Sequence, residues 1–270
     1  MKILIIGSKG SYGKWLSGIL SDQKEDYDII GTDQDETSNI IDFTRNIKES
    51  DVILCVASLV STVHILKFVC ENARKDSLVV DFSSSKKEVC NLMSCGKSDF
   101  LMLHPMCAPP ENSEKIPNTK RVYAINDYRL DNPENALFYK KLKDAIGGNF
   151  VGISMDDHNV VDEMQAITHY LMLSFASFVA FVVEKSDMDY ETLKRHSTPV
   201  SKPLFESLER LMDKGNPETS AKLIELSWRY NSIPFKSAFN FVYRNKLKGI
   251  NRYVEILSKR ITRIRRTIFG

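Results

Sequence analysis

The chain has 270 residues, 43% hydrophobic and 27% charged, which is the composition of a folded globular protein with room for two domains. Its 37 Lys and Arg residues nearly balance 35 Asp and Glu residues, and a net charge of +2 argues against a general nucleic-acid-binding protein. The five cysteines form no CxxC pair and have no histidine at metal-ligand spacing, so we expect reduced thiols, no bound metal and a cytoplasmic location.

The first predicted strand covers residues 2–6 (KILII), a short apolar run typical of a central parallel strand. A glycine-rich loop at residues 7–13 (GSKGSYG) follows, and apolar residues at helical spacing come after it. Strand, glycine loop and helix in this order are typical of dinucleotide-binding folds, because glycines let the backbone approach a pyrophosphate at the helix N-terminus. The candidate cofactor-binding residues in this loop are Gly7, Gly10, Ser11, Tyr12 and Gly13.

The second predicted strand, residues 27–32, ends before Asp33, which lies 20 residues after Gly13 (33 − 13). An acidic residue at this place accepts hydrogen bonds from the ribose hydroxyls of the cofactor. Residues 32–39 contain no Arg or Lys that could bind a 2′-phosphate, so the sequence favours NAD over NADP. The alternative for Asp33 is a solvated turn residue.

Three further strands are predicted at residues 51–56, 78–81 and 100–103, and helical patterns at residues 61–73 and 86–93 separate them. This alternation predicts an α/β fold with a Rossmann-type parallel sheet. Ligands of such sheets bind beyond the carboxyl ends of the strands. The side chains expected at that edge include Ala57 and Ser58 as cofactor contacts, the serines at 83–85, and His104.

The segment LMLHPMCAPP, residues 101–110, marks the end of the fifth strand. Three prolines in the six residues after His104 prevent continuation as a helix or a sheet ladder. We therefore place His104 at the mouth of a crevice. The alternative is a histidine at a strand end whose ring is satisfied by the backbone.

Two more strands are predicted at residues 121–126 and 149–153, on either side of a helix at 134–146. From Met155 on, only helical patterns remain, so the domain boundary is placed at Ser154. Asp156 and Asp157 are expected to cap a long helix that ends near Lys185. Its apolar stretch, residues 166–183, contains a histidine and two serines, which favours a buried helix over a membrane span. Further helices are predicted from residue 189, through 212 after a break at 198–199, through 230, and to the C-terminus.

Several motifs taken together resemble the prephenate dehydrogenase family, which includes the arogenate dehydrogenases. They occur in the expected order over nearly the whole chain: GSKGSYG at 7–13, DFSSSK at 81–86, HPMCAP at 104–109, MQAITH at 164–169 and ERLM at 209–212. The resemblance implies an NAD-binding Rossmann domain at residues 1–154, followed by an all-helical substrate and dimerisation domain at 155–270. It also implies a homodimer with the active site between the two domains, and NAD-dependent oxidative decarboxylation of prephenate to 4-hydroxyphenylpyruvate in tyrosine biosynthesis.

The resemblance also implies roles for individual side chains. His104 would be the base that takes the proton of the substrate C4 hydroxyl, a role suited to a neutral imidazole. Ser84 would hydrogen-bond the same hydroxyl or the histidine, and Arg210 would bind the ring carboxylate with its planar guanidinium. The alternatives are a helix cap for Ser84 and an exposed helix residue for Arg210. His169 lies inside an apolar helix and is expected to face a ligand.

The sequence departs from the family pattern at two places. In the family, the histidine of a Glu-His-Asp motif lies twelve residues before the helical histidine. Here His158, in Asp157-His158-Asn159, precedes His169 by eleven residues (169 − 158). His158 is a candidate substrate contact, and its pairing partner stays open. Ala108 replaces the glycine of HPMxGP. A related substrate, arogenate or amino-deoxyprephenate, therefore stays open. Two other functions also stay open: an enzyme like the β-hydroxyacid dehydrogenases or imine reductases, and a module that senses NAD without turnover.

Overall fold

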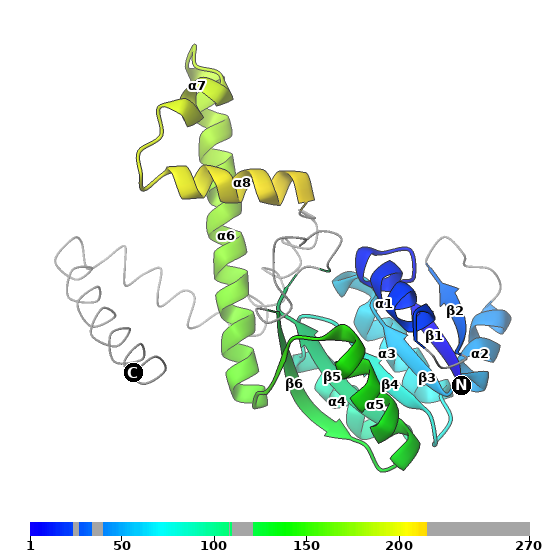
Figure 1. The fold of residues 1–270 in the computed structure, drawn as a ribbon. Coiled ribbons are helices and arrows are strands. Elements are labelled where there is room, and N and C mark those ends of the chain that lie inside the picture. Colours follow the sequence, from blue (N-terminus) through cyan, green and yellow to red (C-terminus); the bar gives the residue numbers. More distant parts are fainter. Residues whose placement is uncertain (24–26, 34–39, 108, 110–120, 215–270) are drawn as a thin grey trace. The chain divides into compact units, whose positions relative to one another are not determined.

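The computed structural model describes residues 1–23, 27–33, 40–107, 109 and 121–214. The chain divides into two compact units, Met1–Leu223 and Ile224–Gly270, and all described residues belong to the first. Predicted helices beyond residue 214 lie outside the described part of the chain. Figure 1 shows the described unit as a layered sheet and helix region followed by a long helix.

Seven strands form one sheet in the order β2-β1-β3-β4-β5-β6-β7. The strands are β1 Lys2–Ile6, β2 Asp28–Thr32, β3 Val52–Cys55, β4 Leu78–Asp81, β5 Asp99–Pro105, β6 Val122–Arg129 and β7 Asn149–Gly152. The five strands from β2 to β5 in this order are mutually parallel, which confirms the predicted Rossmann-type sheet. Strand β6 pairs antiparallel with β5, and β7 is parallel to β6. The proline-rich sequence between β5 and β6 lacks the helical pattern of a parallel crossover.

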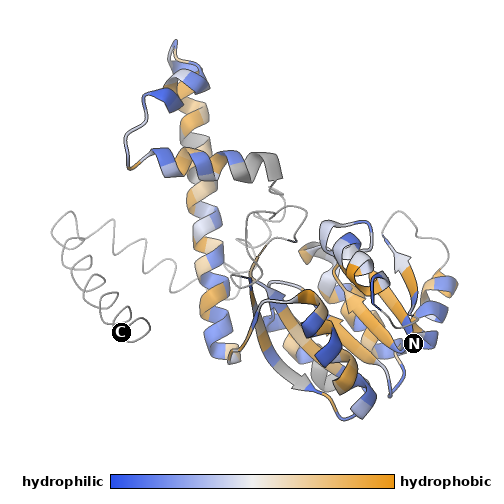
Figure 2. Ribbon diagram, in the orientation of Figure 1, coloured by the Kyte–Doolittle hydropathy of each residue, from blue (hydrophilic) through white to orange (hydrophobic). Residues whose placement is uncertain are grey.

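Helices cover both faces of the sheet: α1 Ser11–Ser21, α2 Ile40–Glu49, α3 Leu59–Asn72, α4 Lys87–Cys95 and α5 Pro133–Ile146. Alternate residues of β1 belong to two buried clusters, because successive side chains of a strand point to opposite faces. Ile3 and Ile5 pack with α1 and α5, whereas Leu4 and Ile6 pack with α2, α3 and α4. Figure 2 shows the strands as largely hydrophobic and the helices as mixed. Burial on both faces explains why the strand sequences are continuous apolar runs.

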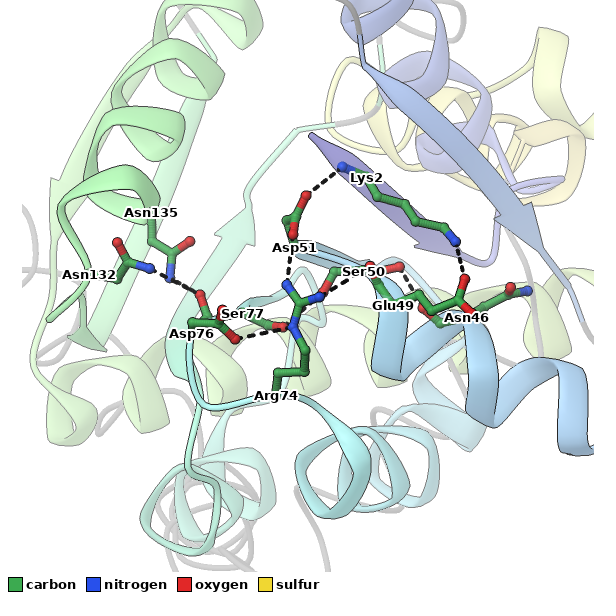
Figure 3. A network of polar contacts seen from close by, with 10 residues as sticks. All are labelled: Lys2, Asn46, Glu49, Ser50, Asp51, Arg74, Asp76, Ser77, Asn132 and Asn135. Atoms are coloured by element: carbon green, nitrogen blue, oxygen red, sulfur yellow. Dashed lines mark hydrogen bonds and ion pairs between the residues drawn. The ribbon is translucent and has the colours of Figure 1, made fainter.

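A polar network joins elements at the amino ends of the strands (Figure 3). The backbone N–H of Lys2 donates to Asp51 Oδ2 at 2.7 Å, and Arg74 Nη2 donates to Asp51 Oδ1 at 2.7 Å. Arg74 Nε also donates to Asp76 Oδ1 at 3.1 Å, and Asn135 Nδ2 donates to the Asp76 carbonyl at 3.0 Å. The network links the starts of β1 and β3 to α5 at the sheet edge opposite His104, so its role is structural.

Three helices follow the sheet: α6 Met155–Lys185, α7 Tyr190–Arg195 and α8 Lys202–Lys214. The predicted cap at Asp156 and Asp157 was wrong, because Ser154 is the N-cap and its hydroxyl accepts the Asp157 N–H at 3.1 Å. A hydroxyl one residue before the first turn can reach this amide. The two acids instead lie within the first turn, where their negative charges interact favourably with the positive end of the helix dipole. The division into two domains at Ser154 stays a prediction.

Helix α6 is only partly buried in the single chain. It packs against α8 through a small cluster formed by Val179, Phe205 and Leu208. Leu171 and Phe181 are about 60% exposed, so the expectation of a buried helix is met along only part of its surface. Within the described ranges, no helix combines the length and apolar character needed to cross a bilayer.

Candidate active site

His104 lies near the end of β5, where α6 crosses the carboxyl edge of the sheet. Its side chain is 2% exposed, and its Nδ1 is 3.0 Å from Nε2 of His158 in the first turns of α6. On the other side of the ring, Nε2 of Gln165 is 3.4 Å from Nε2 of His104. His104 therefore contacts two residues of the helix that begins just after the predicted domain boundary.

One face of α6 carries the polar side chains of the site. His158, Asp162, Gln165 and His169 follow one another at spacings of four, three and four residues, which place them on one side of an α-helix. The eleven residues between the two histidines correspond to about three turns. Because His158 lies inside α6 and contacts His104 directly, its open pairing is now assigned.

His158 is fully buried and lies between His104 and Asp162. Its Nδ1 is 3.2 Å from Asp162 Oδ1, although the contact is not aligned as a hydrogen bond. Neither atom has another hydrogen-bond partner in the described part of the chain. The three residues thus form a buried row from β5 into α6.

A buried ion pair lies beneath His104. Lys86 is fully buried, pairs with the Asp81 carboxylate, and donates from Nζ to the Leu103 carbonyl at 3.2 Å. This bond joins the loop after β4 to the residue preceding His104. Neither Asp81 nor Lys86 was identified from the sequence as a site residue. A lysine that closely follows a buried strand, as in DFSSSK, is a sequence signal that could have indicated this ion pair.

The predicted role of Ser84 receives no direct support from the contacts. Ser84 is half-buried, and among the described residues no hydrogen bond joins its side chain to His104. The neighbouring Ser83 donates from Oγ to Asp81 Oδ2 at 2.9 Å. Ser83 therefore supports the ion pair, and the role of Ser84 stays a prediction.

Burial determines the protonation state of His104. Desolvation, the nearby Lys86 charge and His158 together lower the pKa of His104 from 6.5 to about 3. Its imidazole is therefore neutral at physiological pH and can accept a proton. Burial also lowers the pKa of His169, which is half-buried further along the same face of α6.

The glycine loop after β1 is packed so closely that side chains at two of its positions would clash with backbone atoms. Gly7 has φ of 91°, and a Cβ there would lie 2.7 Å from the Val56 carbonyl oxygen. A Cβ on Gly13 would lie 2.2 Å from the Gly7 oxygen. Gly10 caps α1 without a side-chain hydrogen bond, so the first turn of α1 has no capping side chain. The backbone can thus approach a pyrophosphate at this helix N-terminus.

Other candidate cofactor residues lie around this loop. The Asp33 carboxylate accepts the Lys9 N–H at 2.9 Å, which holds it at the end of β2 beside the loop. A Cβ on Gly7 would also lie 3.0 Å from the Ala57 nitrogen, so the loops after β1 and β3 are adjacent. Ser58 is exposed at the start of α3, and its Oγ is 2.9 Å from Ser61 Oγ. These residues fit a bound dinucleotide.

One hydrogen bond joins the cofactor loop to the segment after His104. The Tyr12 hydroxyl donates to the Cys107 carbonyl, and burial raises the pKa of this phenol. The loop predicted to hold NAD and the segment that follows His104 are thus in direct contact. Ser11 lies at the exposed first position of α1.

Two expected residues lie outside what the structure describes. Arg210 belongs to α8, but its side chain is outside the described residues, and so is Ala108. His64 and His196 are exposed.

No family model matches the chain. A prephenate dehydrogenase from Lactococcus lactis is 28% identical over 120 residues, covering 39% of this chain and 34% of that protein. The match therefore spans about a third of the relative's length.

Solved structures match over nearly the whole chain. A prephenate dehydrogenase from A. aeolicus, in complex with hydroxyphenyl propionate and NAD+, has a TM-score of 0.65 at 15% identity, covering 97% of this chain and 98% of that one. An arogenate dehydrogenase from Synechocystis has a TM-score of 0.56 at 14% identity, covering 98% and 100%. The resemblance predicted from the motifs is confirmed at the level of the fold.

Proposed function

We propose that this protein is an NAD-dependent dehydrogenase that oxidatively decarboxylates prephenate to 4-hydroxyphenylpyruvate, as a cytoplasmic step of tyrosine biosynthesis. The observation that carries the proposal is the position of His104. A neutral, buried imidazole ends the strand whose following segment accepts a hydrogen bond from Tyr12 of the glycine loop. A base and a dinucleotide site next to one another are what dehydrogenation of an alcohol requires.

In this proposal, the glycine loop and Asp33 would hold NAD, which would supply the acceptor for the hydride from C4 of the substrate. Nε2 of His104 accepts the proton of the C4 hydroxyl, which becomes strongly acidic as the hydride departs. This acidity lets an imidazole with a depressed pKa act as the base. Carbon dioxide then leaves from the ring carboxylate and the ring becomes aromatic.

Substrate contacts are proposed on α6, on α8 and at the end of β4. His169 is one turn beyond Gln165 on the face of α6 that contacts His104, which supports a role in binding the substrate. We assign the ring carboxylate to Arg210 and a hydrogen bond to the C4 hydroxyl to Ser84. These two roles rest on the motif resemblance.

Turnover of two substrates tests the proposed function. Purified protein is given NAD with either prephenate or arogenate, and NADH formation is followed by absorbance. We expect reduction of NAD with prephenate. Faster turnover of arogenate would move the assignment to that substrate, and amino-deoxyprephenate is tested in the same way. NAD binding in calorimetry without turnover of any of them would favour an NAD-sensing module.

The residues on α6 argue against the rival enzyme class. β-Hydroxyacid dehydrogenases and imine reductases use a lysine or other group on the long helix. The face of α6 toward His104 carries His158, Asp162, Gln165 and His169, and no lysine is among them. The pairing of His104 with this face therefore supports a dehydrogenase with a histidine base.

The choice of cofactor is tested at Asp33. We expect Asp33→Ala to weaken NAD binding and to reduce the preference for NAD over NADP, because the proposed ribose acceptor is lost. Asp28→Ala, a change at an exposed position in the same strand, is the control. Equal selectivity in the two variants would remove Asp33 from the ribose site.

A homodimer through the helical domain is part of the proposal. Val160, Met164 and Leu171 are each about 60% exposed and form a stripe on α6, roughly opposite the face that contacts His104. A second copy of the chain would cover this stripe. We expect sedimentation analysis to give a dimer and Leu171→Asp to give a monomer. A wild-type monomer would contradict this part of the proposal.

A further inference from the structure

His104 is the first member of a row of three titratable side chains. His104 Nδ1 faces His158 Nε2 at 3.0 Å, and His158 Nδ1 faces Asp162 Oδ1 at 3.2 Å. All three side chains are buried or nearly so. The row starts at the proposed reacting atom and ends within α6, two turns from the helix N-terminus.

The donor atoms are arranged as a chain and not as a metal cage. The three side chains offer ligand atoms within 4.8 Å of one another. However, His158 directs opposite ring nitrogens at its two neighbours, so one ion cannot replace both contacts at once. Opposite nitrogens of one imidazole are instead the arrangement through which a proton is passed on.

Gln165 fixes the direction of the chain. With the Gln165 amide oriented so that its nitrogen, a donor only, faces His104 Nε2 at 3.4 Å, that ring nitrogen carries the lone pair. The His104 proton is then on Nδ1 and is donated to His158 Nε2, which in turn leaves the His158 proton on Nδ1, toward Asp162. The His104 N–H therefore faces His158, and the His158 proton is on the ring nitrogen that lies 3.2 Å from Asp162 Oδ1.

We propose that His158 and Asp162 form a proton relay that orients His104 and holds the substrate proton during turnover. This inference rests on the proposed function, since it needs His104 as the base. Both are positioning residues, because they act through His104.

The proton movements balance in three coupled steps. The substrate O–H bond breaks as H–Nε2 forms on His104; the Nδ1–H of His104 passes to Nε2 of His158; the Nδ1–H of His158 passes to Asp162 Oδ1. Both rings end neutral and Asp162 ends as a neutral acid. The substrate and the product both carry a hydroxyl at C4. The three proton transfers therefore run in reverse when loss of carbon dioxide returns electrons to the ring oxygen, which takes the proton back.

The charges around His104 explain the need for a relay. Lys86 beneath the ring, paired with Asp81 of β4, disfavours an imidazolium at His104. On the side of α6, the neighbours are His158, Asp162 and the uncharged Gln165. Passing the proton to Asp162 avoids a buried positive charge beside Lys86.

The experiment compares Asp162→Asn with Asp156→Asn, an exposed acid in the first turn of the same helix. We expect Asp162→Asn to lower kcat by about 10- to 100-fold and to change the pH profile of kcat, with KM and NAD affinity unchanged. Asp156→Asn should behave like wild type. A kcat and pH profile for Asp162→Asn that match wild type would overturn the relay.

Nitrogen NMR of the imidazoles gives a test without turnover. We expect the resting protein to carry the His104 proton on Nδ1 and the His158 proton on Nδ1, and Asp162→Asn to disturb this order. A proton on Nε2 of resting His104 would overturn the proposal. A loss of activity with EDTA that Zn²⁺ restores would also overturn it.

The two proposals fail in different ways. Wild-type protein that oxidises none of the tested substrates contradicts the proposed function, and with it the relay. Wild-type turnover with an unaffected Asp162→Asn variant contradicts the relay alone.

Discussion

His104 decides most of the chemistry proposed for this protein. We expect His104→Asn to lower kcat by about 100-fold or more, because asparagine fits the site but cannot accept the proton. NAD affinity, measured by calorimetry, should not change, since the glycine loop is untouched. His64→Asn, at an exposed position, is the matched control. Turnover within a few-fold of wild type would reject His104 as the base.

The depressed pKa of His104 predicts the pH dependence of the free enzyme. The neutral base form persists above a pKa of about 3. We therefore expect kcat/KM to stay level as the pH falls from 8 through the ordinary histidine range near 6.5, and to decline only in more acidic solution. An acid limb centred near pH 6.5 would mean that His104 titrates as an exposed histidine does.

Lys86 is predicted to matter for stability. Both partners of its ion pair with Asp81 have fully buried side chains. We expect Lys86→Met to cost about 3–5 kcal/mol in denaturant unfolding, because the Asp81 charge would stay buried without its partner. Exposed Lys75→Met should change stability by less than about 0.5 kcal/mol. Equal midpoints for the two variants would show that the pair is dispensable.

The sequence could predict the site residues whose signal is local. His104 stands between an apolar strand and prolines, and Asp33 stands at a fixed distance from a glycine loop. The residues missed were Asp81, Lys86, Asp162 and Gln165, whose partners lie on other elements or depend on the exact phase of α6. The pairing of His158 with His104 spans 54 residues of sequence, and only the tertiary structure supplies it.

At the scale of elements, the turn from β1 into α1 is where we expect a single added methyl group to have the largest effect on stability. A Cβ on Gly13 would lie 2.2 Å from the Gly7 oxygen and 2.6 Å from Ser8 Cα, both backbone atoms. Gly13→Ala should therefore cost at least about 2 kcal/mol and weaken NAD binding, because the loop must shift.

Gly18 provides the matched control in the same helix. A Cβ there meets nothing within 4 Å. Gly18→Ala should stabilise the protein by about 0.5–1 kcal/mol through helix propensity. Thermal unfolding of the two variants measures both effects. Similar melting temperatures would mean that the loop tolerates a side chain at residue 13.

Most elements could be predicted from the sequence because their patterns are strong. Continuous apolar runs predicted β1, β3, β4 and β5, and helical spacing predicted α3, α5 and α6. Helix α2 was missed, and only Ile47 of its ten residues is buried. The antiparallel direction of β6 could not be predicted, since strand patterns carry no direction.

At the scale of the whole described unit, the two edges of the sheet serve different purposes. The carboxyl edge carries His104, the glycine loop and the end of β3, where ligands of parallel sheets bind. The amino edge carries the network around Asp51 and Arg74, which joins β1, β3 and α5 (Figure 3). Changes at the amino edge should therefore alter stability without altering catalysis.

Acid unfolding tests this division. Although partial burial raises the pKa of Asp51, hydrogen bonds from the Lys2 N–H and from Arg74 outweigh it and hold that pKa below its ordinary value. The unfolded chain thus binds a proton more readily, so the stabilisation is complete above the unfolded pKa, about 4, and is lost as the pH falls through the folded value.

We expect Asp51→Asn to cost about 1 kcal/mol at neutral pH, a modest value because the carboxylate is 41% exposed. The difference in melting temperature between wild type and Asp51→Asn should be constant from pH 7 to about 5 and should shrink below about pH 4. Asp22→Asn, at an exposed position at the end of α1, is the control and should show no such dependence. Because Asp51 lies at the edge opposite His104, kcat should not change in either variant. A difference that grows on acidification would contradict the sign of the Asp51 contribution, and a changed kcat would contradict the separation of the two edges.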